Sequence, residues 1–366
     1  MRKTIRQLAP VLAAILAAAI IIFLGFYFTR LQTVGSIRQV TNRGGYDLYR
    51  IDVKYNYRLD GVIAYGITDD QSMVDAILKE SLPLLPVHIE VPDFGCTAFV
   101  MADTDGTVRM GRNYDFRRDT SAMLVCCSPK GGYRSVGFAA LDNVSANHPL
   151  SSSGKRLACL TAPFICLDGM NEKGVSIAVL TLDSAPTFQH TGKPVIATTL
   201  AIRLVLDNAA TTQEAVELLQ GYDMFASGGR DYHFYITDAS GDGRVVEYDC
   251  DDPARPMVVT EAQVVTNYFA CYADRVQPNQ HNGIYGHGKE RADAVRNCIL
   301  PDISLSENVV WRALRSAAQE PDPASPTSNT QWSVIYNDTD LTAKVVLRRQ
   351  WDDIFQYRLT TNTITR

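Results

Sequence analysis

Two stretches of the sequence decide the fold: GCTAFVMA at residues 95–102 and VRMGRNYD at residues 108–115. Each is short and rich in apolar, β-branched or aromatic residues, which predicts two consecutive strands. The first carries Cys96, and the second carries Arg112 and Asp115. A thiol attacks a carbonyl only as the thiolate, so it needs a base and a counter-charge that holds the base in place. The two stretches therefore indicate an amide-cleaving site with a cysteine nucleophile.

Cys96 has no obvious histidine base. An α-amino group, with a pKa of about 7.7, lies within reach of the sulfur when a cysteine is the first residue of its chain. This predicts a cut between Gly95 and Cys96, because Gly95 supplies the backbone freedom that an N-to-S acyl shift requires. The mature chain would then begin at Cys96. None of the histidines stands at a spacing that indicates a Cys–His dyad (His88, His148, His190, His233, His281 and His287).

Two further motifs follow in order: DGMNEKG at residues 168–174 and VTN at residues 265–267. With GCTAF and GRNYD, they resemble the linear amide C–N hydrolases, which include choloylglycine (bile salt) hydrolases, penicillin V acylases and, more distantly, acid-ceramidase-like enzymes. The resemblance runs from Cys96 to the WSVIY segment at residues 332–336. These families are N-terminal nucleophile hydrolases, in which the nucleophile is the first residue of the mature chain. The resemblance implies a four-layer αββα sandwich and no cofactor.

The resemblance also implies roles for individual residues. Cys96 is the nucleophile with its amine as general base, Asp115 accepts a hydrogen bond from that amine, and Arg112 holds the thiolate and Asp115 in register. Asn267 resembles the oxyanion-hole asparagine, and loss of such a donor typically lowers the rate by about 10²–10³. Thr181 stands at the position that gives a second donor through its backbone, where the family usually carries Asn or Tyr.

Two more residues complete the predicted site. Arg291, in the GHGKER segment, resembles the family's late catalytic-site arginine, and Tyr114 would line the acyl pocket. Structural explanations stand beside these roles. Arg291 could be solvated on a helix face, and Tyr114 could pack in the core. Arg112 and Asp115 alone would suggest an exposed salt bridge, and Asn267 alone a turn residue at a strand end.

An apolar segment without charge runs from Leu8 to Phe28. At about 1.5 Å per residue it spans roughly 30 Å, the thickness of a bilayer core. Bulky residues follow it in place of a small-residue cleavage site, so we expect an uncleaved membrane anchor, with a signal peptide as the alternative. The basic residues ahead of it favour a single-pass cell-membrane protein with an extracellular catalytic domain. Cleavage as a signal would give a secreted domain.

We divide the chain into a membrane anchor or signal (residues 1–30), a linker and pro-segment (31–95) and the hydrolase domain (96–366). Residues 30–44 suggest a polar linker. Asp69 or Asp70 can cap a helix that follows. By resemblance to acid-ceramidase-like enzymes, a strand at 46–55 and a helix at 71–82 should stay packed on the catalytic body after the cut.

The rest of the chain alternates between strands and helices. Strands are predicted at residues 96–102, 108–115, 122–127, 135–141 and 158–166, followed by a hairpin turn at 171–174 to which we assign no chemistry. A helical block follows at 196–208 and 213–219, the second helix opened by Thr211. Strands resume at 232–237 and 244–248, and helices follow at 290–298 and 307–318, the last started by Ser304. This order favours an α+β sandwich behind the N-terminal transmembrane helix.

Composition narrows the possible partners. The chain has 366 residues with 46% hydrophobic content, enough for a large core, and its net charge of −5 without a basic tract argues against nucleic acid. The eight cysteines show no Cys-x-x-Cys pair and no histidine spacing suited to zinc, so we expect no metal site. In an external domain they could form disulfides, although adjacent Cys126 and Cys127 fit small buried hydrophobes better. The oligomeric state is left open.

The expected activity is hydrolysis of a small-molecule N-acyl amide. Bile salts, penicillin V, acyl-homoserine lactones and fatty amides all fit this description. Two alternatives stay open. The same acyl-enzyme could pass its acyl group to an amine, which would make the protein an acyltransferase. An uncut Gly95–Cys96 bond would leave a surface-anchored module without catalysis.

Overall fold

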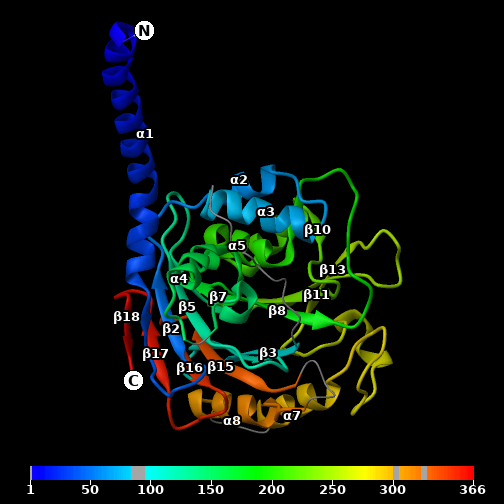
Figure 1. Ribbon diagram of the computed structural model, residues 1–366. Coiled ribbons are helices and arrows are strands. Elements are labelled where there is room, and N and C mark those ends of the chain that lie inside the picture. The colour runs from blue at the N-terminus through cyan, green and yellow to red at the C-terminus, as the bar shows by residue number, and fades with distance from the viewer. Residues whose placement is uncertain (1, 84–94, 148, 300–304, 323–327) are drawn as a thin grey trace.

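Two β-sheets lie face to face in the computed structural model, and helices cover their outer faces (Figure 1). The structure describes residues 2–83, 95–147, 149–299, 305–322 and 328–366. In spatial order the nine-stranded sheet holds β1 (Arg38–Gln39), β2 (Leu48–Asp52), β5 (Ala122–Cys127), β6 (Ser135–Ala140), β7 (Cys166–Asn171), β8 (Ser176–Leu182), β11 (Asp231–Thr237), β12 (Gly243–Tyr248) and β13 (Met257–Glu261). The seven-stranded sheet holds β14 (Val264–Val265), β3 (Gly95–Ala102), β4 (Val108–Asp115), β15 (Thr330–Asn337), β16 (Thr342–Leu347), β17 (Phe355–Arg358) and β18 (Thr363–Thr365). A separate parallel pair joins β9 (Val195–Ala197) to β10 (Asp223–Phe225).

The helices complete a four-layer arrangement, as the family resemblance implies. On the outer face of the nine-stranded sheet, α5 packs against β7 and β8; on the outer face of the other sheet, α7 and α8 pack against β3 and β4. The sheets meet where β3 contacts β8. The α-helices are α1 (Arg2–Ser36), α2 (Leu59–Ala64), α3 (Asp70–Ser81), α4 (Ser153–Ala158), α5 (Thr198–Asn208), α6 (Thr212–Gln220), α7 (Lys289–Ile299) and α8 (Glu307–Ala317). Short 3₁₀ helices are η1 (Leu141–Val144), η2 (Cys159–Phe164) and η3 (Ala270–Arg275).

The largest part of the core lies between the sheets. All eight residues of β4 are buried, and so are those of β5, β6 and β7. Trp332 of β15 stacks on Tyr114 of β4 with ring centroids 4.0 Å apart, and Phe138 of β6 approaches it from the other sheet. Because these strands are covered on both sides, their sequences are nearly continuous apolar runs. The buried positions also hold the charged residues of the site described below.

Residues 158–166, predicted as a strand, fold differently. α4 and η2 occupy residues 153–164, and β7 begins only at Cys166. The Ser152 hydroxyl accepts a hydrogen bond from the backbone N–H of Lys155 at 3.2 Å and caps α4. Pro163 lacks the N–H that a strand ladder needs. The strand prediction was wrong because a short apolar run fits a buried helix as well as a strand.

Residues 30–44 are also more ordered than the predicted linker. α1 continues to Ser36, and β1 pairs with β2. The predicted helix caps are confirmed: Asp69 Oδ1 accepts from Ser72 N at 2.7 Å before α3, and Thr211 Oγ1 accepts from Glu214 N at 3.1 Å before α6. Ser304, predicted to start α8, lies outside the described residues.

Residues upstream of Cys96 are part of the fold. β2 lies between β1 and β5 and pairs in parallel with β5, while α3 packs against η2. Residues 46–55 and 71–82 thus pack on the catalytic body in the intact chain, and their retention after a cut stays a prediction. The division of the chain at Cys96 stays a prediction, because the nine-stranded sheet contains strands from both sides of it.

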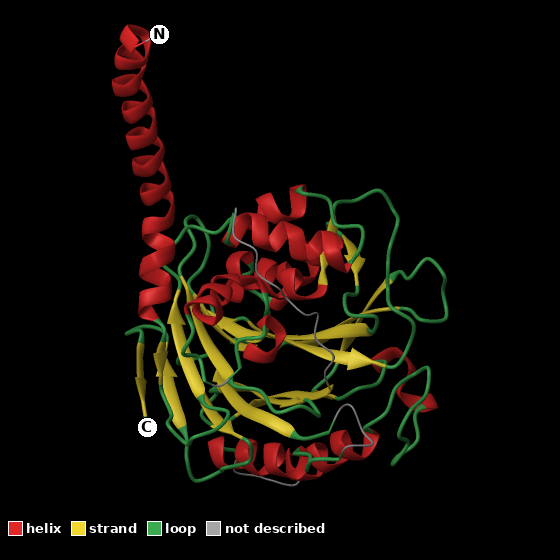
Figure 2. Ribbon diagram, in the orientation of Figure 1, coloured by secondary structure: helices red, strands yellow, loops and turns green. Residues whose placement is uncertain are grey.

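α1 projects away from the rest of the molecule (Figure 2). Within its segment Ala13–Ser36, an 18-residue window has a mean hydropathy of 2.1 and is 12% buried. The helix is therefore long and apolar enough to cross a membrane, and a signal sequence passes the same test. Large apolar side chains are exposed along it (Ile15, Leu16, Ile20, Ile21, Phe23, Leu24, Phe26 and Phe28).

All eight cysteines are free thiols. Cys126 and Cys127 are buried in β5, where they pack as small apolar side chains.

Candidate functional site

Cys96 lies near the start of β3, opposite Tyr114 of β4, and is fully buried. Burial raises the pKa of its thiol to about 11, although the neighbouring guanidinium of Arg112 acts to lower it. In the uncut chain the thiol is therefore protonated near neutral pH. It needs a base before it can attack a carbonyl.

Arg112 forms a buried ion pair that bridges the two sheets. Its Nε lies 3.3 Å from Oδ2 of Asp168 on β7, and both side chains are fully buried. Asp168 also accepts hydrogen bonds from the hydroxyl of Tyr336 at 2.5 Å and from Nε1 of Trp332 at 3.2 Å. Burial raises the pKa of the Asp168 carboxyl, and Arg112 counteracts that shift. The pair holds a positive charge beside the thiol of Cys96.

Asp115 forms no direct ion pair with Arg112 in the described part of the chain, although the charge of Arg112 acts to lower its pKa. It accepts hydrogen bonds from Thr330 Oγ1 at 2.6 Å and Gln319 Nε2 at 2.8 Å, and its Oδ2 lies 3.6 Å from Nη1 of Arg291. Burial raises the pKa of this carboxyl, and Arg291 opposes the shift most strongly. Residues three apart on a strand point to opposite faces. Arg112 therefore faces the other sheet, while Asp115 faces the α7 and α8 side.

Asn267 and Arg291 hold both backbone ends of Cys96. The N–H of Cys96 donates to Oδ1 of Asn267 at 3.1 Å, and the carbonyl of Cys96 accepts from Nη1 of Arg291 at 3.0 Å. Arg291 also donates to Asn267 Oδ1 at 2.7 Å. Asn267 follows β14, which pairs with β3. This pairing places Asn267 next to Cys96. Arg291 reaches the site from α7.

Thr181 reaches the site through its backbone carbonyl, which accepts a hydrogen bond from Nδ2 of Asn267 at 2.9 Å. Its hydroxyl is buried without a hydrogen-bond partner among the described residues. Tyr114 is fully buried against Trp332 and pairs with Cys96 across the strands. The seven predicted site residues thus lie close together around Cys96, and each contacts at least one of the others.

Sequence reasoning missed Asp168, which lies in a motif that indicated only a turn. The turn itself forms after β7, as predicted, because Gly174 adopts a φ of +77°. Asp168 stands within the strand instead. A signal was present, since a carboxylate in an otherwise apolar strand requires a buried charged partner. Its partner Arg112 lies far away in the sequence.

A histidine–aspartate pair beside Asn267 was also missed. The backbone N–H of His287 donates to the Asn267 carbonyl at 2.8 Å, and His287 Nδ1 lies 2.8 Å from Asp183 Oδ2. The residues on both sides, Gly286 and Gly288, have φ values of +104° and +83°. The Gly-His-Gly run was the available signal, because glycines in such conformations allow a close backbone approach.

We expect Gly286→Ala to destabilise the fold more than Gly66→Ala. A Cβ at Gly286 would lie 2.1 Å from the Asn267 carbonyl oxygen, whereas a Cβ at Gly66 (φ +90°) meets nothing within 4 Å. Both variants carry the strain of a left-handed backbone, about 1–2 kcal/mol, and only the first adds a collision, typically about 1–3 kcal/mol. Urea denaturation measures the difference. Equal losses would show that the loop moves away freely from Asn267.

No three His, Cys, Asp or Glu side chains gather as metal ligands in the part of the chain that the structure describes. The groups around Cys96 are instead a thiol, two guanidinium groups, two carboxylates and a carboxamide. These groups suit nucleophilic attack on a carbonyl with charge stabilisation by fixed donors.

Comparisons with known proteins bear on the family and the fold. The linear amide C–N hydrolases of the choloylglycine hydrolase family match residues 96–271. Penicillin V acylase from Agrobacterium tumefaciens is similar in structure, with a TM-score of 0.54 and 20% identity, over 72% of this chain and 86% of that one. Two variants of conjugated bile acid hydrolase from Clostridium perfringens also have TM-scores of 0.54 and 16% identity, over 74% of this chain and 95% or 96% of theirs. At these identities the structural likeness shows the fold, an N-terminal nucleophile hydrolase fold. Together with the family match over residues 96–271, it supports assignment of the chain to the choloylglycine hydrolase family of linear amide C–N hydrolases, enzymes that act on carbon–nitrogen bonds other than peptide bonds.

Proposed function

We propose that this protein cuts its own chain between Gly95 and Cys96 and then hydrolyses a small N-acyl amide with Cys96 as nucleophile. The observation that carries the proposal is the environment of Cys96. Asn267 holds its backbone nitrogen, Arg291 holds its carbonyl, and the Arg112 guanidinium lies beside its thiol. The family match supports the amide as substrate.

In the cut, Sγ of Cys96 loses its proton and attacks the carbonyl carbon of Gly95. The Gly95–Cys96 C–N bond breaks, the nitrogen of Cys96 takes a proton, and a thioester remains. Water then hydrolyses the thioester, which leaves a carboxylate on Gly95 and a free amine and thiol on Cys96. Asn267 Oδ1 already lies 3.1 Å from that nitrogen, so it can orient the new amine without rearrangement.

In turnover, the free amine takes the thiol proton, and the thiolate attacks the carbonyl of the substrate. Nδ2 of Asn267 carries two hydrogens and gives one to the Thr181 carbonyl, which leaves a donor for the developing oxyanion. Arg112 stabilises the thiolate by its charge. Asp115 and Arg291 hold the amine and Asn267 in place from the opposite face of β4, and Tyr114 borders the acyl group.

The pH dependence of the cut follows from the thiol. Because its pKa is about 11 in the uncut chain, the thiolate fraction rises about tenfold per pH unit from neutrality to about pH 10. We expect the cutting rate to rise in the same way, whereas turnover should level off above about pH 8, once the α-amine is deprotonated. Mass spectrometry of freshly purified chain incubated at each pH measures the cut. A cutting rate that does not change with pH would contradict this account.

We further propose that α1 anchors the protein in a membrane with the catalytic part outside the cell. Its exposed apolar side chains support this, because they have no partner in the rest of the described chain. The alternative is removal of α1 as a signal sequence. The intact mass of the purified protein separates the two outcomes.

The two fragments should stay together after the cut. β2 is enclosed by β1 and β5, and two tyrosines that follow it are tied to the catalytic part: Tyr55 donates to the Leu160 carbonyl at 2.6 Å, and Tyr57 donates to Asp207 at 2.9 Å. A denaturing gel should show two bands, while size exclusion in mild detergent shows one species. Urea should release residues 96–366 from membranes and leave the α1 fragment behind. Release without urea would contradict this prediction.

The function is tested by N-terminal sequencing of the purified protein and by release of free amine from candidate amides. Penicillin V and conjugated bile acids are suitable first substrates, because the structurally similar enzymes are named for them. We expect a fragment that begins at Cys96 and an activity that grows with the fraction of cut chain. Full activity in an uncut chain would overturn the proposed base.

A further inference from the structure

We infer that a cavity between α1 and the α2–α3 pair binds the phosphate headgroup of an anionic phospholipid. The cavity has a volume of about 630 Å³. It is lined by cationic and aromatic side chains together with one carboxylate (Phe26, Arg30, Arg58, Tyr65, Lys79 and Glu80). The inference rests on the proposed insertion of α1 into a membrane.

Arg30 supplies a buried positive charge to the cavity. The residue is 6% exposed, and its guanidinium donates to the carbonyls of Ser81 at 2.9 Å, Glu80 at 2.7 Å and Phe26 at 3.2 Å. These three carbonyls are neutral. They satisfy the hydrogen bonds of the Arg30 guanidinium but do not form an ion pair with it. A buried cation without an ion-pair partner is costly, so binding of an anion beside it is favourable.

Two further cations border the cavity without an ion-pair partner. Within the described residues, neither the Arg58 guanidinium nor the Lys79 ammonium forms an ion pair with a carboxylate. The carboxylate of Glu80 instead accepts a hydrogen bond from the backbone N–H of Arg58 at 3.0 Å. Lys79 Nζ lies 4.8 Å from the ring centroid of Tyr65, which is 44% exposed. Three cations therefore face one anion.

The position of the cavity favours a lipid over a soluble anion. α2 and α3 lie at the end of the body from which α1 projects (Figure 1). Phe26 belongs both to the cavity lining and to the exposed apolar surface of α1. Acyl chains could therefore lie along α1 while the headgroup reaches Arg30. Exposed tyrosine and basic residues are typical of the membrane interface.

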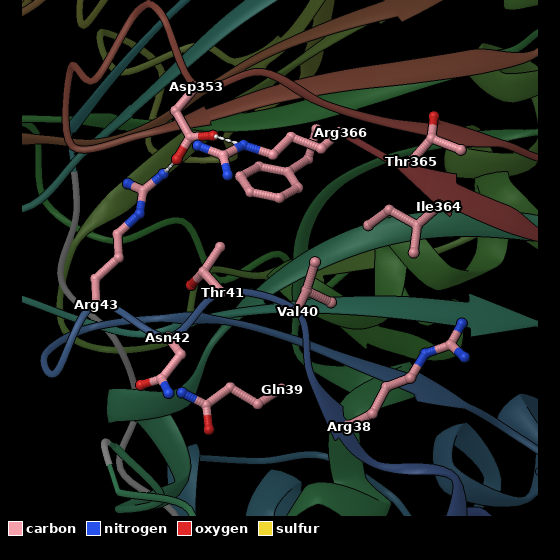
Figure 3. A pocket seen from close by; sticks show the side chains of 11 residues that line it. Arg38, Gln39, Val40, Thr41, Asn42, Arg43, Asp353, Ile364, Thr365 and Arg366 are labelled. Atoms are coloured by element: carbon pink, nitrogen blue, oxygen red, sulfur yellow. Dashed lines mark hydrogen bonds and ion pairs between the residues drawn. The ribbon is translucent and has the colours of Figure 1, made fainter.

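A second cavity serves as the contrast. It has about 570 Å³ and lies at the other end of the packed part of α1, next to β1 and β18 (Figure 3). Here one carboxylate, Asp353, pairs with both Arg43 and Arg366, so two of the three cations at this cavity already have an ion-pair partner. Of these two cavities, only the one beside α2 and α3 has a buried cation, surface cations without an ion-pair partner, and the exposed apolar side of α1.

The test uses the full chain in detergent, mixed with equal amounts of phosphatidylglycerol and phosphatidylcholine that carry the same acyl chains. Native mass spectrometry counts the retained lipids. We expect a preference of about tenfold for phosphatidylglycerol, which falls to near equality in Arg58→Gln/Lys79→Gln. The control Arg38→Gln/Arg366→Gln removes two cations at the second cavity and should keep the preference. Lys79→Gln alone should show a partial loss if the double variant does not fold.

Equal retention of both lipids by the wild type, or an unchanged preference in the double variant, would overturn the inference. Displacement of phosphatidylglycerol by millimolar inorganic phosphate would assign the cavity to a soluble anion and also overturn it. A purified chain that lacks α1 by mass would instead refute the proposed anchor. An uncut chain would refute only the proposed self-cleavage, because the cavity lies upstream of Cys96.

Discussion

Replacing Cys96 with alanine is expected to leave the chain uncut and to remove amide hydrolysis completely. Both proposed reactions use the same sulfur, first on the Gly95 carbonyl and then on the carbonyl of the substrate, and a methyl group can perform neither. Intact mass and release of free amine measure the two losses. A Cys96→Ala chain that is still cut before residue 96 would show that another protease makes the cut.

Two variants separate the loss of the nucleophile from a general effect on folding. Cys159→Ala removes another buried thiol, whose pKa burial raises to about 12, and should be cut and active like the wild type. Cys96→Ser keeps a nucleophile of similar size, but its hydroxyl is much less acidic than a thiol. The serine variant should therefore be cut slowly, and equal rates for serine and cysteine would argue against thiolate attack.

The two strands that carry Cys96 and Arg112 could be predicted from the sequence, because their order and length are local properties. Their partners could not. Arg112 reaches Asp168 only because the two sheets pack face to face, and Asp115 reaches Arg291 only because α7 packs on the outer face of the same sheet, against β3 and β14. Strand alternation alone already separates Arg112 from Asp115. The sequence was therefore sufficient to reject the exposed salt bridge that these two residues alone suggested.

The region before Cys96 shows a second limit of sequence reasoning. Residues 30–44 are polar enough to suggest a linker, yet Arg30 and Thr33 are buried against the body. Their burial depends on hydrogen bonds to α3 and to the segment after β2: Arg30 donates to the Ser81 carbonyl, and Lys54 N donates to Thr33 Oγ1 at 2.8 Å. The composition of residues 30–44 does not indicate hydrogen bonds to residues so far away in the sequence. The sequence alone does not distinguish a polar residue that is buried with hydrogen-bond partners from one that is exposed to solvent.

Arg112→Met is expected to destabilise the fold by about 3–5 kcal/mol, because it leaves Asp168 buried without its positive partner. Tyr336 and Trp332 would still donate to the carboxylate, but neither neutralises its charge. Arg134→Met is the control, since Arg134 pairs with Glu172 at 2.7 Å at the surface, where the arginine side chain is 48% exposed. Removal of an exposed pair costs about 0–1 kcal/mol. Urea denaturation measures both variants.

The pH dependence and a double variant distinguish an unpaired charge from a packing defect. Burial already raises the pKa of Asp168, and without Arg112 the pKa should rise further above its unfolded value. A carboxyl with a raised pKa favours the folded state at low pH and opposes it as pH rises, so the loss in Arg112→Met should be smaller at pH 5 than at pH 8. Arg112→Met/Asp168→Leu should recover much of the stability at both pH values. It should not recover activity, because the positive charge beside the Cys96 thiol is still missing. Recovery of both together would mean that Arg112 acts on the fold alone.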